Sequence, residues 1–222
     1  MDHETRSCMA AAIDAAVEKD ILMFCAADDA EPDAMTGRSD DHLSYPAYFS
    51  QKVIILGAAD PTGTVWINTH KPYNFILPGC RIRQRYWDDM AAQGGEESAK
   101  RPELNGSSIA TALASGLAGL LLYCVRASAV YVSNESRKGS PPRPGASDLD
   151  INDFSRLHTR AKIMEAFKHI GASSDTDAEF IRVWETFDVA TKQIKVAEGK
   201  TMETKWAAVF DAVRDIVKKN NH

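Results

Sequence analysis

The sequence predicts an α/β domain built around a parallel β-sheet, with an α-helical extension at its C-terminal end. Two short apolar runs, residues 21–27 and 53–57, suit strands that are covered on both faces, as in a parallel sheet. Residues 104–125 contain no charged residue and predict a long apolar helix. A helix, several strands and then a long apolar helix is the order of elements in a layered α/β domain.

Composition limits the classes of function. The chain has 222 residues, of which 44% are hydrophobic and 26% are charged, the balance of an ordinary globular protein. Its 26 Lys and Arg against 31 Asp and Glu give a net charge of −5, which argues against a nucleic-acid partner. The N-terminus has no basic stretch leading into an apolar core, so no secretory signal is expected.

The spacing of the cysteines suggests no metal site. Cysteines occur at four scattered positions, without CxxC or Cys/His spacing: Cys8, Cys25, Cys80 and Cys124. We expect four reduced thiols in an intracellular protein, and neither a metal nor a cofactor.

The remaining elements follow from local patterns. Apolar residues at helical spacing predict an N-terminal helix over residues 7–18, and short apolar runs predict strands at 65–67 and 75–77. Residues 133–152 are rich in Ser, Pro, Gly and charge, and predict a flexible linker. Three later apolar stripes, within 157–167, 180–187 and 206–217, predict helices. We therefore divide the chain into an α/β part (1–132), a linker (133–152) and a helical extension (153–222).

The charge-free helix has two interpretations. A charge-free stretch of 22 residues could just span a bilayer, and a small membrane-anchored protein is one hypothesis. The polar opening NGSS at 105–108 and three glycines favour the alternative, a helix in the centre of an α/β domain. We expect the buried helix, and no membrane partner.

The entry to this helix carries the candidate chemistry. The sequence NGSSIA at 105–110 places a glycine and two serines where the helix begins. Backbone N–H groups are unpaired at such a position and the helix dipole is positive there. A serine hydroxyl in this setting can attack a carbonyl while the N–H groups hold the resulting oxyanion. The alternative is that Ser107 or Ser108 merely caps the helix.

The order of segments over residues 7–130 resembles the later part of the subtilisin-like serine peptidase domain. Four segments carry the resemblance. Residues 21–29, followed by 45–47, are similar to the oxyanion-side strand of the family and the loop after it, and VIILGAAD at 53–60 is similar to the family motif V-x-x-V-G-A-x-D. FILPG at 75–79 is similar to L-A-P-G, and GSSIA at 106–110 is similar to the nucleophile box G-T-S-M-A. The implied fold is an incomplete subtilisin-like three-layer domain. Ser108 is then the implied nucleophile, and Gly106 and Ser107 are implied to contact substrate.

Three departures from the family pattern bear on activity. The resemblance gives Asp29 the oxyanion-hole position, where the family has an Asn, and a carboxylate cannot donate a hydrogen bond. The Pro-His after the family box is Ala112-Leu113 here. The Asp and His boxes that precede the serine in the family do not occur, and no histidine is followed by Gly-Thr. We therefore expect this chain to begin after both boxes, with the other half of the domain supplied elsewhere.

Two functional hypotheses follow from the resemblance. The first is a serine-type endopeptidase that uses Ser108 on a peptide or protein substrate and turns over little on its own, because a serine without a base is a weak nucleophile. The second is a non-catalytic pseudopeptidase retained for binding or regulation.

Overall fold

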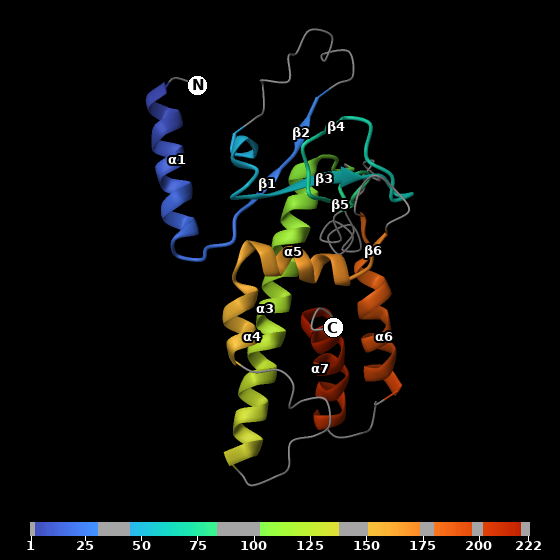
Figure 1. Cartoon of the computed structure of the whole chain (residues 1–222). Helices are drawn as coiled ribbons and strands as arrows, with labels where there is room; N and C mark the ends of the chain where they lie inside the picture. The colour runs from blue at the N-terminus through green and yellow to red at the C-terminus, as the bar shows by residue number, and fades with distance from the viewer. Residues whose placement is uncertain are drawn as a thin grey trace, which may run out of the picture.

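A computed structural model describes residues 3–30, 45–83, 103–137, 151–173, 180–196 and 202–218 (Figure 1). The predicted α/β class is confirmed, because a mainly parallel sheet packs against helices. The helices are α1 (His3–Val17), α3 (Ser107–Arg137), α4 (Ile151–Leu157), α5 (Arg160–His169), α6 (Val183–Val196) and α7 (Met202–Lys218). A short 3-10 helix, η2, spans Ala47–Phe49.

The main sheet has the strand order β1-β3-β5-β7-β6. Its strands are β1 (Phe24–Ala26), β3 (Ile54–Ala59), β5 (Phe75–Pro78), β7 (Phe180–Ile181) and β6 (Ala172–Ser173). The pairs from β1 to β7 are parallel, and β6 is antiparallel at one edge. A separate antiparallel pair joins β2 (Asp28–Asp29) to β4 (Thr69–His70), directly beyond the end of β1.

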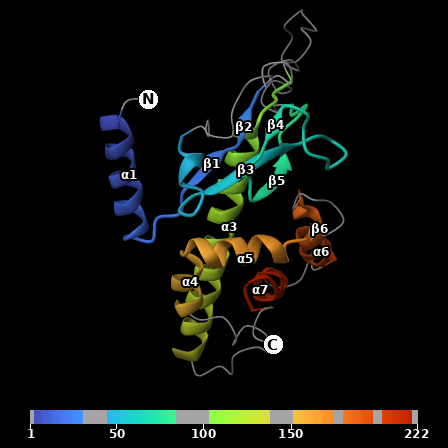
Figure 2. The same ribbon diagram turned by 45° about the horizontal axis from the view of Figure 1, so that its top comes forward.

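A continuous apolar run in the central strand explains why both faces of the sheet are buried. All six residues of β3 are buried, as the continuous apolar run predicts. Ile54 and Leu56 point to the face covered by α3, whereas Ile55 points to the opposite face, with Cys25. The core on the α3 side also includes apolar residues of α4, α5 and α7. Figures 1 and 2 show α5 crossing α3 while α4 and α7 lie beside its lower half.

Two of the predicted elements differ in the structure. The strand predicted at 65–67 is wrong, because only an isolated bridge joins Val65 to Ala59, and Ile67 is 74% exposed. Phe180 belongs to β7 rather than to the helix predicted from the apolar stripe at 180–187, which begins at Val183. Strand β7 has only two residues, so its apolar side chains cannot show strand alternation and merge with the helical stripe.

Helix α3 continues to Arg137, five residues into the segment predicted as linker. The apolar spacing persists through Val130, and α4 and α7 pack along this part of the helix. Residues 138–150 of the predicted linker lie outside the described residues. The stretch Ser107–Asn134 is long and apolar enough to cross a membrane, with a mean hydropathy of 1.8, and 39% of its most apolar part is buried in the fold.

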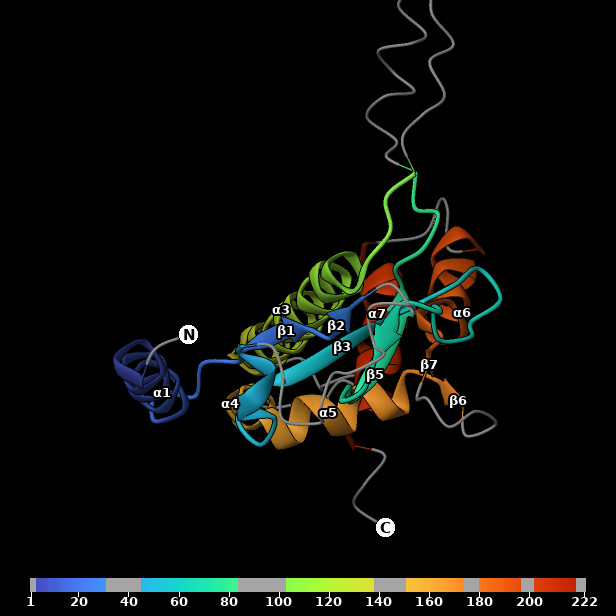
Figure 3. The same cartoon turned by 90° about the horizontal axis from the view of Figure 1, so that it is seen from above.

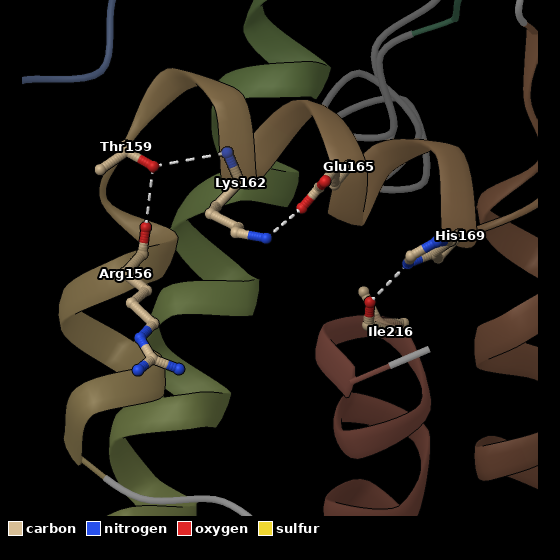
Figure 4. A network of polar contacts seen from close by, with 6 residues as sticks. All are labelled: Arg156, Thr159, Lys162, Glu165, His169 and Ile216. Atoms are coloured by element: carbon tan, nitrogen blue, oxygen red, sulfur yellow. Dashed lines mark hydrogen bonds and ion pairs between the residues drawn. The ribbon is translucent and has the colours of Figure 1, made fainter. Parts of the chain in front are cut away.

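The helices after α3 are joined by specific polar contacts (Figure 4). Thr159 caps α5, because its Oγ1 accepts from the Lys162 backbone N–H and donates to the Arg156 carbonyl. At the other end of α5, Nδ1 of His169 lies 2.9 Å from the Ile216 carbonyl oxygen of α7. The Thr159 contacts fix the corner between α4 and α5, and the His169 contact holds α7 against the C-terminal end of α5.

A guanidinium joins these helices to the sheet. Arg160, at the start of α5, donates from Nε to the Val53 carbonyl and from Nη2 to the Ser50 carbonyl, each at 3.0 Å. Because burial penalises the charge, the pKa of Arg160 is lowered from its ordinary value. Helix α1 lies beyond β1 at the side of the molecule (Figure 3), where Asp14 pairs with Lys52.

Burial of Cys25 predicts a loss of stability at alkaline pH. Desolvation raises the pKa of its thiol from 9.0 to about 11. The unfolded chain loses this proton above pH 9 while the folded protein keeps it, so the free energy of unfolding is expected to fall by about 1–3 kcal/mol between pH 9 and 11. Urea unfolding at several pH values, compared with Cys25→Ala, measures this part of the decline. Cys8→Ala, at an exposed thiol, is the control and should leave the decline unchanged; an equally steep decline in Cys25→Ala contradicts the assignment.

Candidate active site at the N-terminus of α3

The entry to α3 is clamped against the segment that follows β5. The Gly106 N–H donates to the Gly79 carbonyl at 2.7 Å, and the Arg81 N–H donates to Asn105 Oδ1 at 2.6 Å. Ile82 and Leu104 form an antiparallel bridge. The helix tip is therefore held by backbone contacts from a rigid strand end.

Two glycines make this close approach possible. A Cβ on Gly79 would lie 2.6 Å from the Ala58 Cβ and 2.9 Å from the Gly106 carbonyl oxygen, so there is no space for a side chain. Gly106 has φ +137, which L side chains rarely adopt. A Cβ at Gly106 would lie 3.3 Å from Asp29 Oδ2 and 3.4 Å from Ser108 Oγ. The carboxylate and the hydroxyl thus both border the space that Gly106 leaves open.

Ser107 is fully buried and held by a hydrogen-bond network. Its hydroxyl donates to Asp29 Oδ1 at 2.6 Å and accepts from the Ala58 N–H at 3.0 Å. The Thr69 hydroxyl lies 3.2 Å from it and also donates to Asp29 Oδ1 at 2.9 Å. A hydroxyl with these partners is a structural anchor between α3 and the sheet, although the sequence predicted that Ser107 contacts substrate, a role that stays a prediction.

Asp29 acts as an acceptor at this site. Its Oδ2 takes the Ser107 backbone N–H at 2.6 Å, while its Oδ1 takes the Ser107 and Thr69 hydroxyls. A carboxylate that accepts an unpaired N–H at the first turn of a helix also stabilises the positive end of the dipole. Asp29 is therefore the cap of α3, supplied from 78 residues earlier in the chain. That it occupies an oxyanion-hole position stays a prediction from the resemblance.

Ser108 differs from its neighbour because one helical residue turns the side chain by about 100°. Its side chain is exposed, and within the described ranges neither its hydroxyl nor its N–H has a recorded protein partner. The hydroxyl therefore stands free at a helix N-terminus, beside its own backbone N–H, whereas the Ser107 N–H donates to Asp29 and the Ile109 N–H donates to the Gly106 carbonyl. A free hydroxyl next to a free N–H is part of the arrangement that nucleophilic attack on a carbonyl requires.

In the part of the chain that the structure describes, no histidine is hydrogen-bonded to Ser108, and the acidic group that borders its hydroxyl is Asp29. The His70 ring lies 3.2 Å from the Ala30 carbonyl, and the His169 ring contacts α7 far from the tip. The same ranges contain no group of three His, Cys, Asp or Glu side chains able to hold a metal ion.

The structure brings together residues that the motifs alone did not connect. The four segments of the resemblance meet at the tip of α3: β2 through Asp29, β3 through Ala58, β5 through Gly79, and the helix itself. Thr69 and Asn105 also belong to this site, and sequence reasoning assigned them no role. The alternation of a two-residue strand gives no signal for Thr69.

Fold and site together define a parallel α/β domain that presents a serine hydroxyl at a glycine-flanked helix tip. No family model matches the chain, and no curated protein matches it. Among solved structures the chain is similar to the PatG macrocyclase domain, with 14% identity and a TM-score of 0.42, over 94% of this chain and 46% of that one. A PatG macrocyclase in complex with peptide matches over 93% and 46%, with the same identity and TM-score. The chain thus spans about half the length of these structures.

Proposed function

We propose that this chain is the nucleophile-bearing part of a subtilisin-like serine peptidase, with Ser108 as the residue that forms the acyl intermediate. One observation carries the proposal: the four segments that resemble the family converge on a buried Ser107 and leave the Ser108 hydroxyl free.

The chemistry at the tip follows from the donors present. Ser108 Oγ attacks the carbonyl carbon of a peptide bond, and the hydroxyl proton passes to a base. Charge that develops on the carbonyl oxygen is stabilised by the Ser108 backbone N–H, because the Ser107 N–H donates to Asp29 and the Ile109 N–H donates to the Gly106 carbonyl. The carbon–nitrogen bond then breaks as the amine takes a proton. Without a base at the described site, we expect little turnover from the chain alone.

The Asp29 carboxylate opposes this chemistry electrostatically. It borders the same space as Ser108 Oγ, so it repels a developing oxyanion. This carboxylate is the observation that favours the second candidate, a pseudopeptidase that binds peptide without cleaving it.

Labelling with a fluorophosphonate distinguishes these two functions. We expect slow labelling of the wild-type chain, none in Ser108→Ala, and retained labelling in Ser107→Ala. Asp29→Asn is expected to be labelled about tenfold faster because the repelling charge is gone. Mass spectrometry of the labelled peptide and circular dichroism of each variant check the site and the fold.

Two outcomes contradict acyl transfer at Ser108. Equal labelling in Ser108→Ala removes Ser108 from the role of nucleophile. A folded wild-type protein and a folded Asp29→Asn variant that both remain unlabelled favour the pseudopeptidase instead.

A further inference from the structure

A cavity lies at the carboxyl ends of the parallel strands, and Ser108 is not among its lining residues. Its volume is about 540 Å³, within the usual range of small-molecule sites. The walls come from two loops, residues 60–64 after β3 and 80–82 after β5, and from residues 182–185, where β7 leads into the first turn of α6. Figure 3 shows β5 and β7 beside α6, which begins directly after β7. In open α/β sheets, ligands bind outside this edge of the strands.

One wall of the cavity is aromatic. The rings of Phe180 and Trp184 lie 5.7 Å apart at 60°, and Trp184 is 47% exposed. The turn after β3 lies directly on Phe180, because a Cβ on Gly63 would be 2.8 Å from its Cε1. Since φ of Gly63 is +86, a glycine is needed in this turn for both reasons. The wall is thus a fixed apolar surface with one edge open to solvent.

The anionic side of the cavity is Asp60. Its Oδ1 accepts from the Thr62 N–H, the Thr62 hydroxyl and the Thr64 N–H, at 2.8, 2.6 and 3.1 Å. These hydrogen bonds lower the pKa of Asp60, with the Thr62 hydroxyl as the largest cause, so the carboxylate is ionised at neutral pH. Its Oδ2 takes none of these three bonds and has no cationic partner within the described residues.

The cationic side is Arg81, on a different loop. Its backbone is held at φ +57 by the hydrogen bond to Asn105, so the base of the side chain is fixed. No carboxylate pairs with its guanidinium in the described ranges. The two other charged side chains that line the cavity form an ion pair with each other, because Arg182 Nη1 lies 2.9 Å from Glu185 Oε1. Among the described residues that line the cavity, the Asp60 carboxylate and the Arg81 guanidinium are therefore the two charged groups without a charged partner.

We propose that this cavity binds a small zwitterion with an aromatic side chain, the chemical class of a free aromatic amino acid. The ligand carboxylate pairs with Arg81, its ammonium group pairs with Asp60, and its ring packs against Phe180 and Trp184. A guanidinium matches a carboxylate with two parallel N–H donors, which suits Arg81 to this role. Binding here requires no reaction at Ser108, so the inference is independent of the proposed peptidase chemistry.

Calorimetric titration of the full chain with three matched probes tests the proposal. L-phenylalanine is expected to saturate the site below about 10 mM, because a ligand with few heavy atoms gains only a modest binding free energy. N-acetyl-L-phenylalanine lacks the ammonium group, L-phenylalaninamide lacks the carboxylate, and each is expected to bind about tenfold more weakly.

Two variants assign each end of the ligand. Arg81→Gln should weaken L-phenylalanine about tenfold and leave the affinity for L-phenylalaninamide unchanged. Asp60→Asn keeps Oδ1 as the acceptor of its own turn, and should weaken L-phenylalanine while leaving N-acetyl-L-phenylalanine unchanged. Arg83→Gln is the matched control, because Arg83 pairs with Glu103 and does not line the cavity.

Several results overturn the inference. They are the absence of saturable binding to the folded wild-type chain, equal affinity for all three probes, and L-phenylalanine affinity that Arg81→Gln lowers no more than Arg83→Gln does. Competition between the fluorophosphonate and L-phenylalanine would place the ligand at Ser108 and also contradict it.

Discussion

Gly79→Ala is expected to lower the free energy of unfolding by about 3 kcal/mol. The new Cβ would lie 2.6 Å from the Ala58 Cβ and 2.9 Å from the Gly106 carbonyl oxygen. Neither contact is the end of a flexible side chain, so β3 or the entry to α3 must shift. The hydrogen bond from Gly106 to Gly79 is then strained as well.

Urea unfolding of Gly79→Ala and Gly116→Ala measures this effect against a matched change. Gly116 is exposed in the middle of α3 and a Cβ there meets nothing within 4 Å. Alanine favours a helix interior, so Gly116→Ala should raise the free energy of unfolding by about 0.5–1 kcal/mol. If the two substitutions change the free energy of unfolding in opposite directions, close packing around position 79, and not the loss of a glycine as such, is the reason that residue 79 must be glycine. A loss below about 0.5 kcal/mol in Gly79→Ala would show that the approach of the two segments is not tight.

Asp29→Ala is expected to lower the free energy of unfolding by about 1–3 kcal/mol and to loosen the first turn of α3. The Ser107 N–H loses its acceptor, and the buried Ser107 hydroxyl loses the carboxylate to which it donates. Asp29→Asn keeps one carbonyl oxygen for the N–H and should have a smaller effect. Urea unfolding gives the stability, and amide hydrogen exchange at 107–109 gives the local loosening.

Asp14→Ala is the control for Asp29→Ala. Asp14 also makes a charged contact, with Lys52, but both side chains are largely exposed, so its loss should cost less than about 1 kcal/mol. If Asp29→Ala is as mild as this control and leaves hydrogen exchange of the first turn unchanged, the carboxylate is not the cap of α3.

Much of the sheet and its central helix could be predicted from local sequence. The continuous apolar runs predict β1 and β3, and the charge-free segment predicts the first five turns of α3. These predictions succeed because burial on both faces requires apolar residues at every position. Strand β7 could not be found in this way, because two residues carry no period and its pairing partner, β5, lies about 100 residues earlier.

The candidate site, like the fold, has features that follow from the sequence and features that only the tertiary structure shows. By itself, the sequence determined that a serine pair follows a glycine at the start of an apolar helix, and that no family Asp or His box accompanies it. Two adjacent serines are equivalent in a motif, and only the fold separates them. Packing of α3 on β3 turns Ser107 into the interior, where Ala58, Thr69 and Asp29 bind it, and the next residue around the helix, Ser108, is left in solvent. Tertiary contacts decided which hydroxyl is buried and which is exposed, because the direction of a side chain on a helix has meaning only relative to the surface that the helix buries.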